Sequence, residues 1–286
     1  MANFIIKDGV GIIPQGVTKI EDRAFKGCTD LTSIVIPDSV TKIGEDAFYG
    51  CTGLTSIEIP DSVTSIENYA FQGCTGLTYI EIPDSVTEIG HHTFRDCTGL
   101  TSIEIPDSVT KIVWNAFQGC TGLTSIKVAE GNKVYDSRNN CNAIIKRETN
   151  TLISGCKSTE IPDSVTKIEK SAFEGCTGLI SIVIPDSVTW IGDYAFEGCT
   201  GLTSIEIPKG VTTIGEKAFY GCTGLKEMTL PVGVKKIAEE AFHDCNALER
   251  IYVPAKKTDY YKSRLPEELH SLIVELAPEK KTKVKK

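Results

Sequence analysis

Eleven cysteines are the residues of this 286-residue chain best suited to chemistry, as metal ligands, disulfide partners or nucleophiles. A thiol that repeats at one inward-facing position packs as a small apolar group. Stacked thiols also leave each sulfur with at most two close sulfur neighbours, rather than the four tetrahedral ligands of a structural zinc. We therefore expect no metal site and reduced, unreactive thiols at the nine cysteines that each follow a phenylalanine by three residues: Cys28, Cys51, Cys74, Cys97, Cys120, Cys176, Cys199, Cys222 and Cys245.

The remaining two cysteines, Cys141 and Cys156, fall outside this register. Residues 140–156 form two apolar runs around a polar connection, a pattern that predicts a β-hairpin. If Lys146 pairs with Thr151, the hairpin register brings Cys141 opposite Cys156. The two thiols would then form a disulfide in an oxidising compartment and stay free in a reducing one.

Motifs of catalysis are weak in this chain. The Ser-x-x-Lys pattern of penicillin-recognising acylases begins at Ser39, Ser108 and Ser164, but each copy lies in an extended segment and lacks the partner motifs. The histidines have no His-x-x-x-His spacing, and no glycine loop suits a phosphate. We therefore predict a protein that is not an enzyme and binds no cofactor.

Composition narrows the partners further. The net charge is −8, and the five Lys and one Glu of residues 279–286 leave residues 1–278 with a net charge of −12. Such an acidic body repels phosphate backbones, so nucleic acid is not an expected partner. No apolar stretch is long enough to insert in a membrane, and the first residues do not read as a signal peptide, so localisation stays open between cell surface and cytoplasm.

A 23-residue repeat must position all of these residues, and residues 77–97 show one copy. Alternation in residues 54–60 predicts a short strand that ends at a proline, and residues 63–66 predict a second extended piece. We expect a short helical or 3-10 turn before the Ala-Phe pair and a glycine-bearing turn after it. A period of this length predicts a mainly β solenoid of stacked coils with a parallel strand face.

The motifs Ile-Pro-Asp-Ser-Val-Thr-x-Ile and Ala-Phe-x-Gly-Cys-Thr-x-Leu resemble the bacterial surface-antigen (BspA-like) leucine-rich repeat, over roughly residues 10–255. The resemblance implies a right-handed leucine-rich-repeat solenoid that binds host or bacterial surface macromolecules and does not catalyse. It also implies export or attachment to the cell surface.

We predict one domain over residues 1–286. Residues 1–30 would form an N-terminal cap and first partial coil, residues 31–254 the repeats, and residues 255–286 a C-terminal cap with a Lys-rich tail. The coil at about 129–160 is irregular, because ten extra residues carry the hairpin. Two interpretations remain open: a register adjuster that bends the solenoid, or a lip that projects beside the binding face.

Function is expected where the repeats differ. Glu58, Glu81, Glu104 and then Lys127 occupy one outward column of the strands, and Tyr79 interrupts the neighbouring column of small residues. This acidic stripe predicts a partner with basic groups, although Glu and Ser could equally serve to keep an open strand face soluble.

A second candidate cluster lies on the turns, where Tyr69, His92 and Trp114 occupy adjacent coils. We therefore predict a module that binds proteins or glycans through its strand face. The alternative is a structural spacer or self-assembly element without a selective face, and the oligomeric state is not determined by the sequence.

Overall fold

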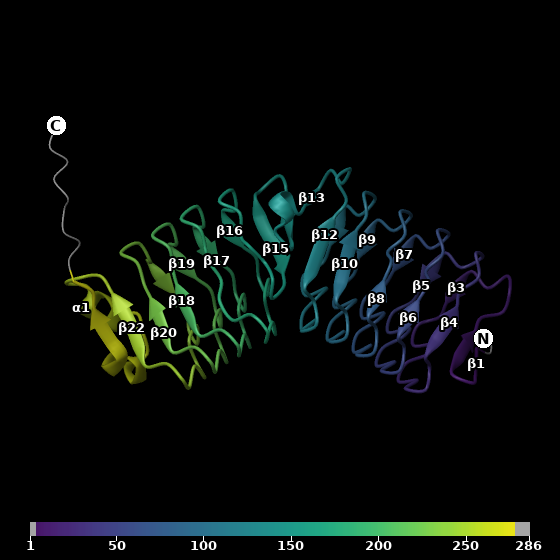
Figure 1. Cartoon of the computed structure of the whole chain (residues 1–286), viewed down its shortest axis with the longest axis horizontal. Helices are drawn as coiled ribbons and strands as arrows, with labels where there is room; N and C mark the ends of the chain where they lie inside the picture. The colour runs from purple at the N-terminus through teal and green to yellow at the C-terminus, as the bar shows by residue number, and fades with distance from the viewer. Residues whose placement is uncertain (1–3, 278–286) are drawn as a thin grey trace.

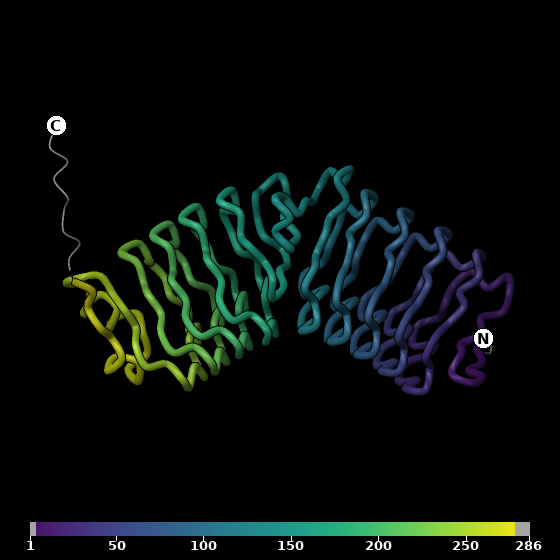
Figure 2. The backbone as a smooth tube through the Cα atoms, in the orientation of Figure 1, coloured from purple at the N-terminus to yellow at the C-terminus, as the bar shows by residue number. Residues whose placement is uncertain are grey.

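The computed structural model describes residues 4–277, which form a single row of stacked coils bent into an arch (Figures 1 and 2). Each regular coil contributes two short strands. The first strands form the strand face: β4 (Ser33–Val35), β6 (Ser56–Ile57), β8 (Tyr79–Ile80), β10 (Ser102–Ile105), β12 (Ser125–Val128), β18 (Ser204–Glu206), β20 (Glu227–Thr229) and β22 (Arg250–Val253). The second strands are β3 (Lys19–Ile20), β5 (Lys42–Ile43), β7 (Ser65–Ile66), β9 (Glu88–Ile89), β11 (Lys111–Ile112), β16 (Lys167–Ile168), β17 (Trp190–Ile191), β19 (Thr213–Ile214) and β21 (Lys236–Ile237).

Identical side chains stack on one another from coil to coil, as the repeat predicts. The phenylalanine rings lie nearly parallel at centroid distances of 5.0 to 5.7 Å. Seven of the nine column cysteines are buried, and the Sγ of each of these seven lies 3.0–3.2 Å from the carbonyl oxygen of a phenylalanine in the preceding coil. Each thiol thus fills space and donates a hydrogen bond to a backbone acceptor.

The segment before each Ala-Phe pair is a turn, not the helical turn expected from the sequence. Tyr69 has φ +60°, a left-handed conformation that breaks any helix, and its N–H donates to His91 O at 2.8 Å. The N–H of Phe71 donates to Thr93 O at 2.9 Å. These backbone groups bond to the next coil rather than within their own, so stacking replaces helical hydrogen bonds. We call the edge formed by these turns the turn edge.

Elements that differ from the repeat lie at both ends of the described residues. At the N-terminus, β1 (Ile5–Lys7) and β2 (Val10–Ile12) form an antiparallel hairpin whose turn residues Asp8 and Gly9 both have positive φ. At the C-terminus, α1 (Thr258–Lys262) and η2 (Glu267–Leu272) close the last coil, and β23 (Ile273–Glu275) adds a parallel strand to β22. The Lys-rich tail at 279–286 lies outside the described residues.

The irregular coil, residues 129–160, is named the junction coil. It contains β13 (Tyr135–Asp136), η1 (Arg138–Asn140), β14 (Ala143–Lys146) and β15 (Thr151–Gly155). Alternate residues of β14 face opposite ways: Ile144 packs in the core of the N-terminal half, whereas Ile145 packs in the core of the C-terminal half. The hairpin is therefore a wall between two half-solenoids.

The junction coil is a coil without its Ala-Phe-x-Gly-Cys turn, and this absence bends the molecule. On the turn edge the two halves meet directly, because Gly119 N–H donates to Glu174 O at 3.2 Å. Elsewhere the hairpin separates them, with β15 paired in parallel to β16. The hairpin therefore increases the distance between the two halves on one side only, and the row of coils bends into an arch. β13 and β15 lie at the crest of this arch (Figure 1). The hairpin lies between the two cores at the bend, which is the arrangement that the register-adjuster interpretation predicts.

The predicted hairpin pairing is right near its tip and wrong near its ends. Lys146 pairs with Thr151, as expected, but the register shifts between Ile144 and Ile145. This bulge moves Cys141 out of line with Cys156, and the two thiols pack in the C-terminal and N-terminal cores, respectively. Both are free, so the expected facing of these two cysteines is corrected.

Thiol reactivity tests this packing. Burial raises the pKa of Cys51 and Cys120 to about 12, so little thiolate exists at neutral pH. We expect iodoacetamide to leave the buried column cysteines of the folded protein unmodified, with the half-buried Cys28 and Cys176 reacting first. Mass spectrometry of the native, alkylated protein checks this. Rapid labelling of Cys74, or a disulfide between column cysteines, would contradict the stacked interior.

Candidate functional site

The strand face carries five of the predicted site residues, four of them in one row. Glu58, Glu81, Glu104 and Lys127 are all exposed, and β10 pairs with β12 so that Glu104 lies beside Lys127. Tyr79 stands beside this row with 54% of its surface exposed. Neighbouring coils bring the Glu carboxylates close together on a flat strand surface, as the repeat predicts.

A second row of carboxylates, which the sequence analysis overlooked, runs parallel to the first. It comes from the aspartates of the Pro-Asp-Ser-Val corners, and its exposed members in the N-terminal half are Asp38, Asp61, Asp84 and Asp107. Glu58 and Glu81 share a surface hollow of about 640 Å³ with Asp38 and Asp61. The repeat itself was the signal, because an aspartate that recurs at the corner in most copies also forms a charged row; Lys209 and Val232 replace it in two later copies.

The two rows continue into a second hollow of about 390 Å³. Its lining includes Glu81, Asp84, Glu104, Asp107 and Glu130. Shallow, acidic hollows of this kind suit extended basic groups at the surface rather than an enclosed small molecule.

The C-terminal half of the strand face carries more exposed apolar side chains. Val183 and Val232 are 84% and 59% exposed, and they border a groove of about 840 Å³ that also includes Pro208 and Leu276. The ion pair between Lys209 and Asp186, at 2.7 Å, lies at this groove. Asp186 and Glu206 also line this groove, so carboxylates continue into the C-terminal half but are interrupted there by apolar residues and Lys209.

The remaining predicted residues gather on the turn edge, away from the strand face. The rings of Tyr69 and His92 stack at 5.2 Å, and Trp114 packs edge-on against His91 at 4.6 Å. Burial, followed by the nearby charges of Arg95 and His91, lowers the pKa of His92, so this ring is neutral at pH 7. The predicted residues therefore divide between two separate surfaces.

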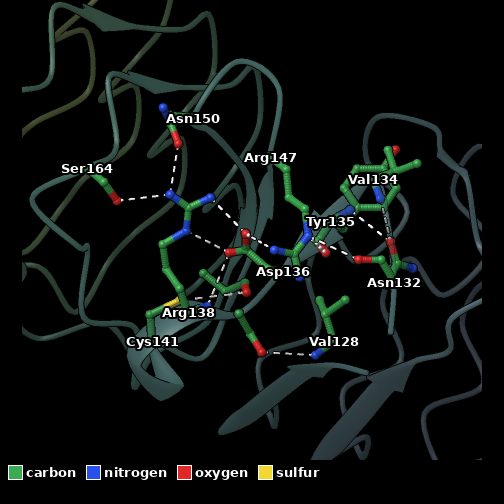
Figure 3. A network of polar contacts seen from close by, with 12 residues as sticks. Val128, Asn132, Val134, Tyr135, Asp136, Arg138, Cys141, Arg147, Asn150 and Ser164 are labelled. Carbon is green, nitrogen blue, oxygen red and sulfur yellow. Dashed lines mark hydrogen bonds and ion pairs between the residues drawn. The ribbon is translucent and has the colours of Figure 1, made fainter. Parts of the chain in front are cut away.

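An ion-pair network holds the junction coil between the halves (Figure 3). Asp136, 7% exposed, accepts from Arg138 Nε at 2.8 Å and Nη2 at 2.7 Å, while Arg147 Nη1 lies 3.3 Å away. Desolvation alone would raise the pKa of Asp136, but hydrogen bonds and charge from Arg138, with the charge of Arg147, lower it overall. Arg138 Nη1 also donates to Asn150 Oδ1 at 2.8 Å and Ser164 Oγ at 3.1 Å, so this network is a structural clamp.

Catalytic and metal chemistry gain no support from the geometry. Within residues 4–277, no three His, Cys, Asp or Glu side chains converge as a metal site requires. The thiols are buried with raised pKa values, as described above. In the same residues, no helix has the length and apolar character needed to cross a bilayer.

Comparison with known proteins matches this architecture to a family. A model of the BspA type leucine rich repeat region matches residues 18–145 and 144–264, with six copies of the repeat. A comparison with curated proteins gave no match.

Solved structures agree with the family match. A leucine-rich repeat protein from Eubacterium ventriosum is 28% identical with a TM-score of 0.70, over 86% of this chain and 66% of that one. A leucine rich cell surface protein from Faecalibacterium prausnitzii is 29% identical with a TM-score of 0.57, over 99% of this chain and 96% of that one. The pneumococcal vaccine antigen PcpA, 19% identical over 98% of this chain and 96% of its own, has a TM-score of 0.56 and shares the fold.

Proposed function

Because the chain belongs to the BspA-type leucine-rich repeat family, we propose that it is a non-catalytic binding module whose strand face recognises basic segments of partner proteins. A solenoid of this kind is a protein-interaction type of scaffold, and it offers extended area in place of a pocket. One of its structural relatives is described as a cell surface protein, which supports a place at the cell surface for this chain as well.

The observation that carries the proposal is the double row of carboxylates, made of Glu58, Glu81 and Glu104 on the strands and Asp38, Asp61, Asp84 and Asp107 at the corners. Single surface charges only keep a protein soluble, but two aligned rows create a field that attracts and orients an extended cation. Arg and Lys side chains of a partner would reach both rows at once. The exposed ring of Tyr79 adds apolar and cation–π contact within the same surface.

Charge reversal tests this assignment. We expect the triple variant Glu58→Lys, Glu81→Lys, Glu104→Lys to weaken binding of a fluorescent oligolysine peptide by about 100-fold, because attraction becomes repulsion at three adjacent contacts. Fluorescence anisotropy at low and high salt measures the effect.

The matched control places the same three charges elsewhere. The variant Glu45→Lys, Glu148→Lys, Glu239→Lys changes exposed residues away from the strand face and alters net charge equally. If both variants lose the same affinity for the peptide, the loss comes from net charge alone and the row of glutamates is not a binding site. Self-association in light scattering, without peptide binding by the wild type, would instead support the structural-spacer alternative.

A further inference from the structure

A groove runs along the C-terminal half of the strand face, where β18, β20 and β22 lie side by side (Figure 1). It has a volume of about 840 Å³ and takes one proline from each of four successive coils: Pro185, Pro208, Pro231 and Pro254. Leu276 and Ala277 complete the lining at its C-terminal end. Ala277 is also the last residue that the structure describes, so the groove begins where residues 278–286 follow in the chain.

Apolar side chains in this groove occupy positions that are charged in neighbouring coils. Val183 is 84% exposed, Val232 59% and Leu276 41%. Glu206 holds the position of Val183 one coil later, and Asp186 holds the position of Val232 two coils earlier. A solubilising role therefore does not explain the two valines. Exposed apolar side chains that gather around one groove mark a surface that another segment covers.

Carboxylates beside these apolar residues define the charge of that segment. Asp186 and Glu206 line the groove, and Glu160 and Asp163 are exposed on the preceding coil. Lys209 pairs with Asp186 at 2.7 Å and offsets one of these charges. The remaining negative charge favours an occupant that carries basic groups together with an apolar one.

Residues 278–286 of the chain have this composition and sufficient length. They contain five Lys, one Glu and one Val, and thus a net charge of +4. Four coil steps separate Leu276 from Pro185, which is about 19 Å at the spacing of neighbouring strands. Nine extended residues span about 30 Å, so the segment can cover the whole groove and reach the preceding coil. Val284, seven residues beyond Ala277, can reach the level of Val183.

We propose that residues 278–286 dock in this groove of the same molecule, as an extended segment whose lysines pair with Glu206 and Asp186 and whose Val284 lies against Val183. Single surface ion pairs are weak, but a segment joined to its binding surface has an effective concentration in the millimolar range. Weak contacts are therefore sufficient to occupy the groove. A foreign protein would gain access to it only by displacing the segment. This surface is separate from the double row of carboxylates, and the inference does not rest on the proposed function.

Zero-length cross-linking of the full chain tests the docking. A carbodiimide joins a lysine Nζ to a carboxylate that it touches, and mass spectrometry after chymotryptic digestion locates the link. We expect the lysines of residues 278–286 to link to Glu206 or Asp186. Glu58 lies nine coil steps from the C-terminal end, about 42 Å, and should not link to them within one molecule. An equal mixture of unlabelled and nitrogen-15-labelled protein separates links within a molecule from links between molecules.

A matched pair of variants tests the apolar contact. Val183→Arg should lower the initial yield of these links at least about fivefold, because it removes the apolar contact and repels the lysines. Arginine itself does not react with the carbodiimide. Val35→Arg adds the same charge at the same repeat position in the N-terminal half, where the valine is 67% exposed, and should leave the yield unchanged. Circular dichroism should show the wild-type fold in both variants, because both side chains are exposed.

Four results would overturn the inference. They are the absence of links between residues 278–286 and the groove, links that form only between molecules, equal linking to Glu58 and Glu206 within one molecule, and wild-type yield in Val183→Arg. Links only between molecules would assign the groove to a second copy of the chain. Oligolysine binding measures the strand-face proposal separately, since that proposal depends on carboxylates of the N-terminal half.

Discussion

Replacing Asn132 with alanine is expected to lower the free energy of unfolding by about 4 kcal/mol, because one buried amide makes four hydrogen bonds. Asn132 is 1% exposed. Its Nδ2 donates to Pro106 O at 2.7 Å and Val109 O at 2.9 Å, and its Oδ1 accepts from the N–H groups of Val134 at 2.9 Å and Tyr135 at 2.8 Å. The amide thus ties the last regular coil to the start of the junction coil.

Urea unfolding of two further variants isolates this role. Asn132→Val restores the residue of the repeat, since Val109 stands 23 positions earlier, and it fills the space without the hydrogen bonds. It should remain destabilised by at least about 2 kcal/mol, because backbone N–H groups stay buried and unpaired. Asn246→Ala, at an exposed turn position, should change stability by less than about 0.5 kcal/mol. Wild-type stability in Asn132→Val would show that packing alone holds the junction.

The regular coils could be predicted from the sequence because each residue of the repeat has one environment. Period-two alternation in residues 54–60 defined the strand face, the proline defined its end, and the Asp8-Gly9 pair defined the N-terminal hairpin. The exposure of Glu58, Glu81 and Glu104 followed from the same alternation. Local patterning was sufficient wherever one coil packs on an identical one.

The junction could not be predicted in the same way, because its structure depends on two unlike surfaces. The hairpin pairs as expected at Lys146, but a bulge appears where Ile144 and Ile145 must reach opposite cores. Two signals were present in the sequence. Asn132 occupies an inward position that is valine in the repeat, and Gly155 ends a strand where a turn glycine is not needed.

The candidate sites were only partly predictable for a related reason. The glutamate position varies between repeats, and this variation suggested a functional site. The corner aspartate recurs in most repeats, so its role in the turn seemed a sufficient explanation for it. The meeting of Trp114 with Lys170 was hidden, because 56 positions separate them in sequence and only the missing turn brings them together. The position of a residue in the repeat predicts whether its side chain is exposed, but it does not predict which residues meet across the junction coil.

Gly155→Ala is expected to destabilise the protein by about 2–3 kcal/mol, although alanine usually stabilises an extended segment relative to glycine. Gly155 takes the place that phenylalanine holds in regular coils, and its N–H donates to Ala172 O at 2.9 Å. The ring of Phe173 covers it so closely that an added Cβ would lie 2.2 Å from Cε1. Phe173 cannot retreat, because Phe196 stacks on it at 5.0 Å.

A double-mutant cycle with Phe173→Leu shows whether the ring is the cause. Shortening Phe173 removes the atoms that an alanine at position 155 would strike, so the cost of Gly155→Ala should fall below about 1 kcal/mol in that background. Gly178→Ala is the matched control, because an added Cβ there meets only the flexible Lys157 side chain. If Gly155→Ala costs the same with leucine as with phenylalanine at position 173, the clash is not what requires glycine. The wedge between the two halves would then depend on the backbone of β15 rather than on the space beneath the ring.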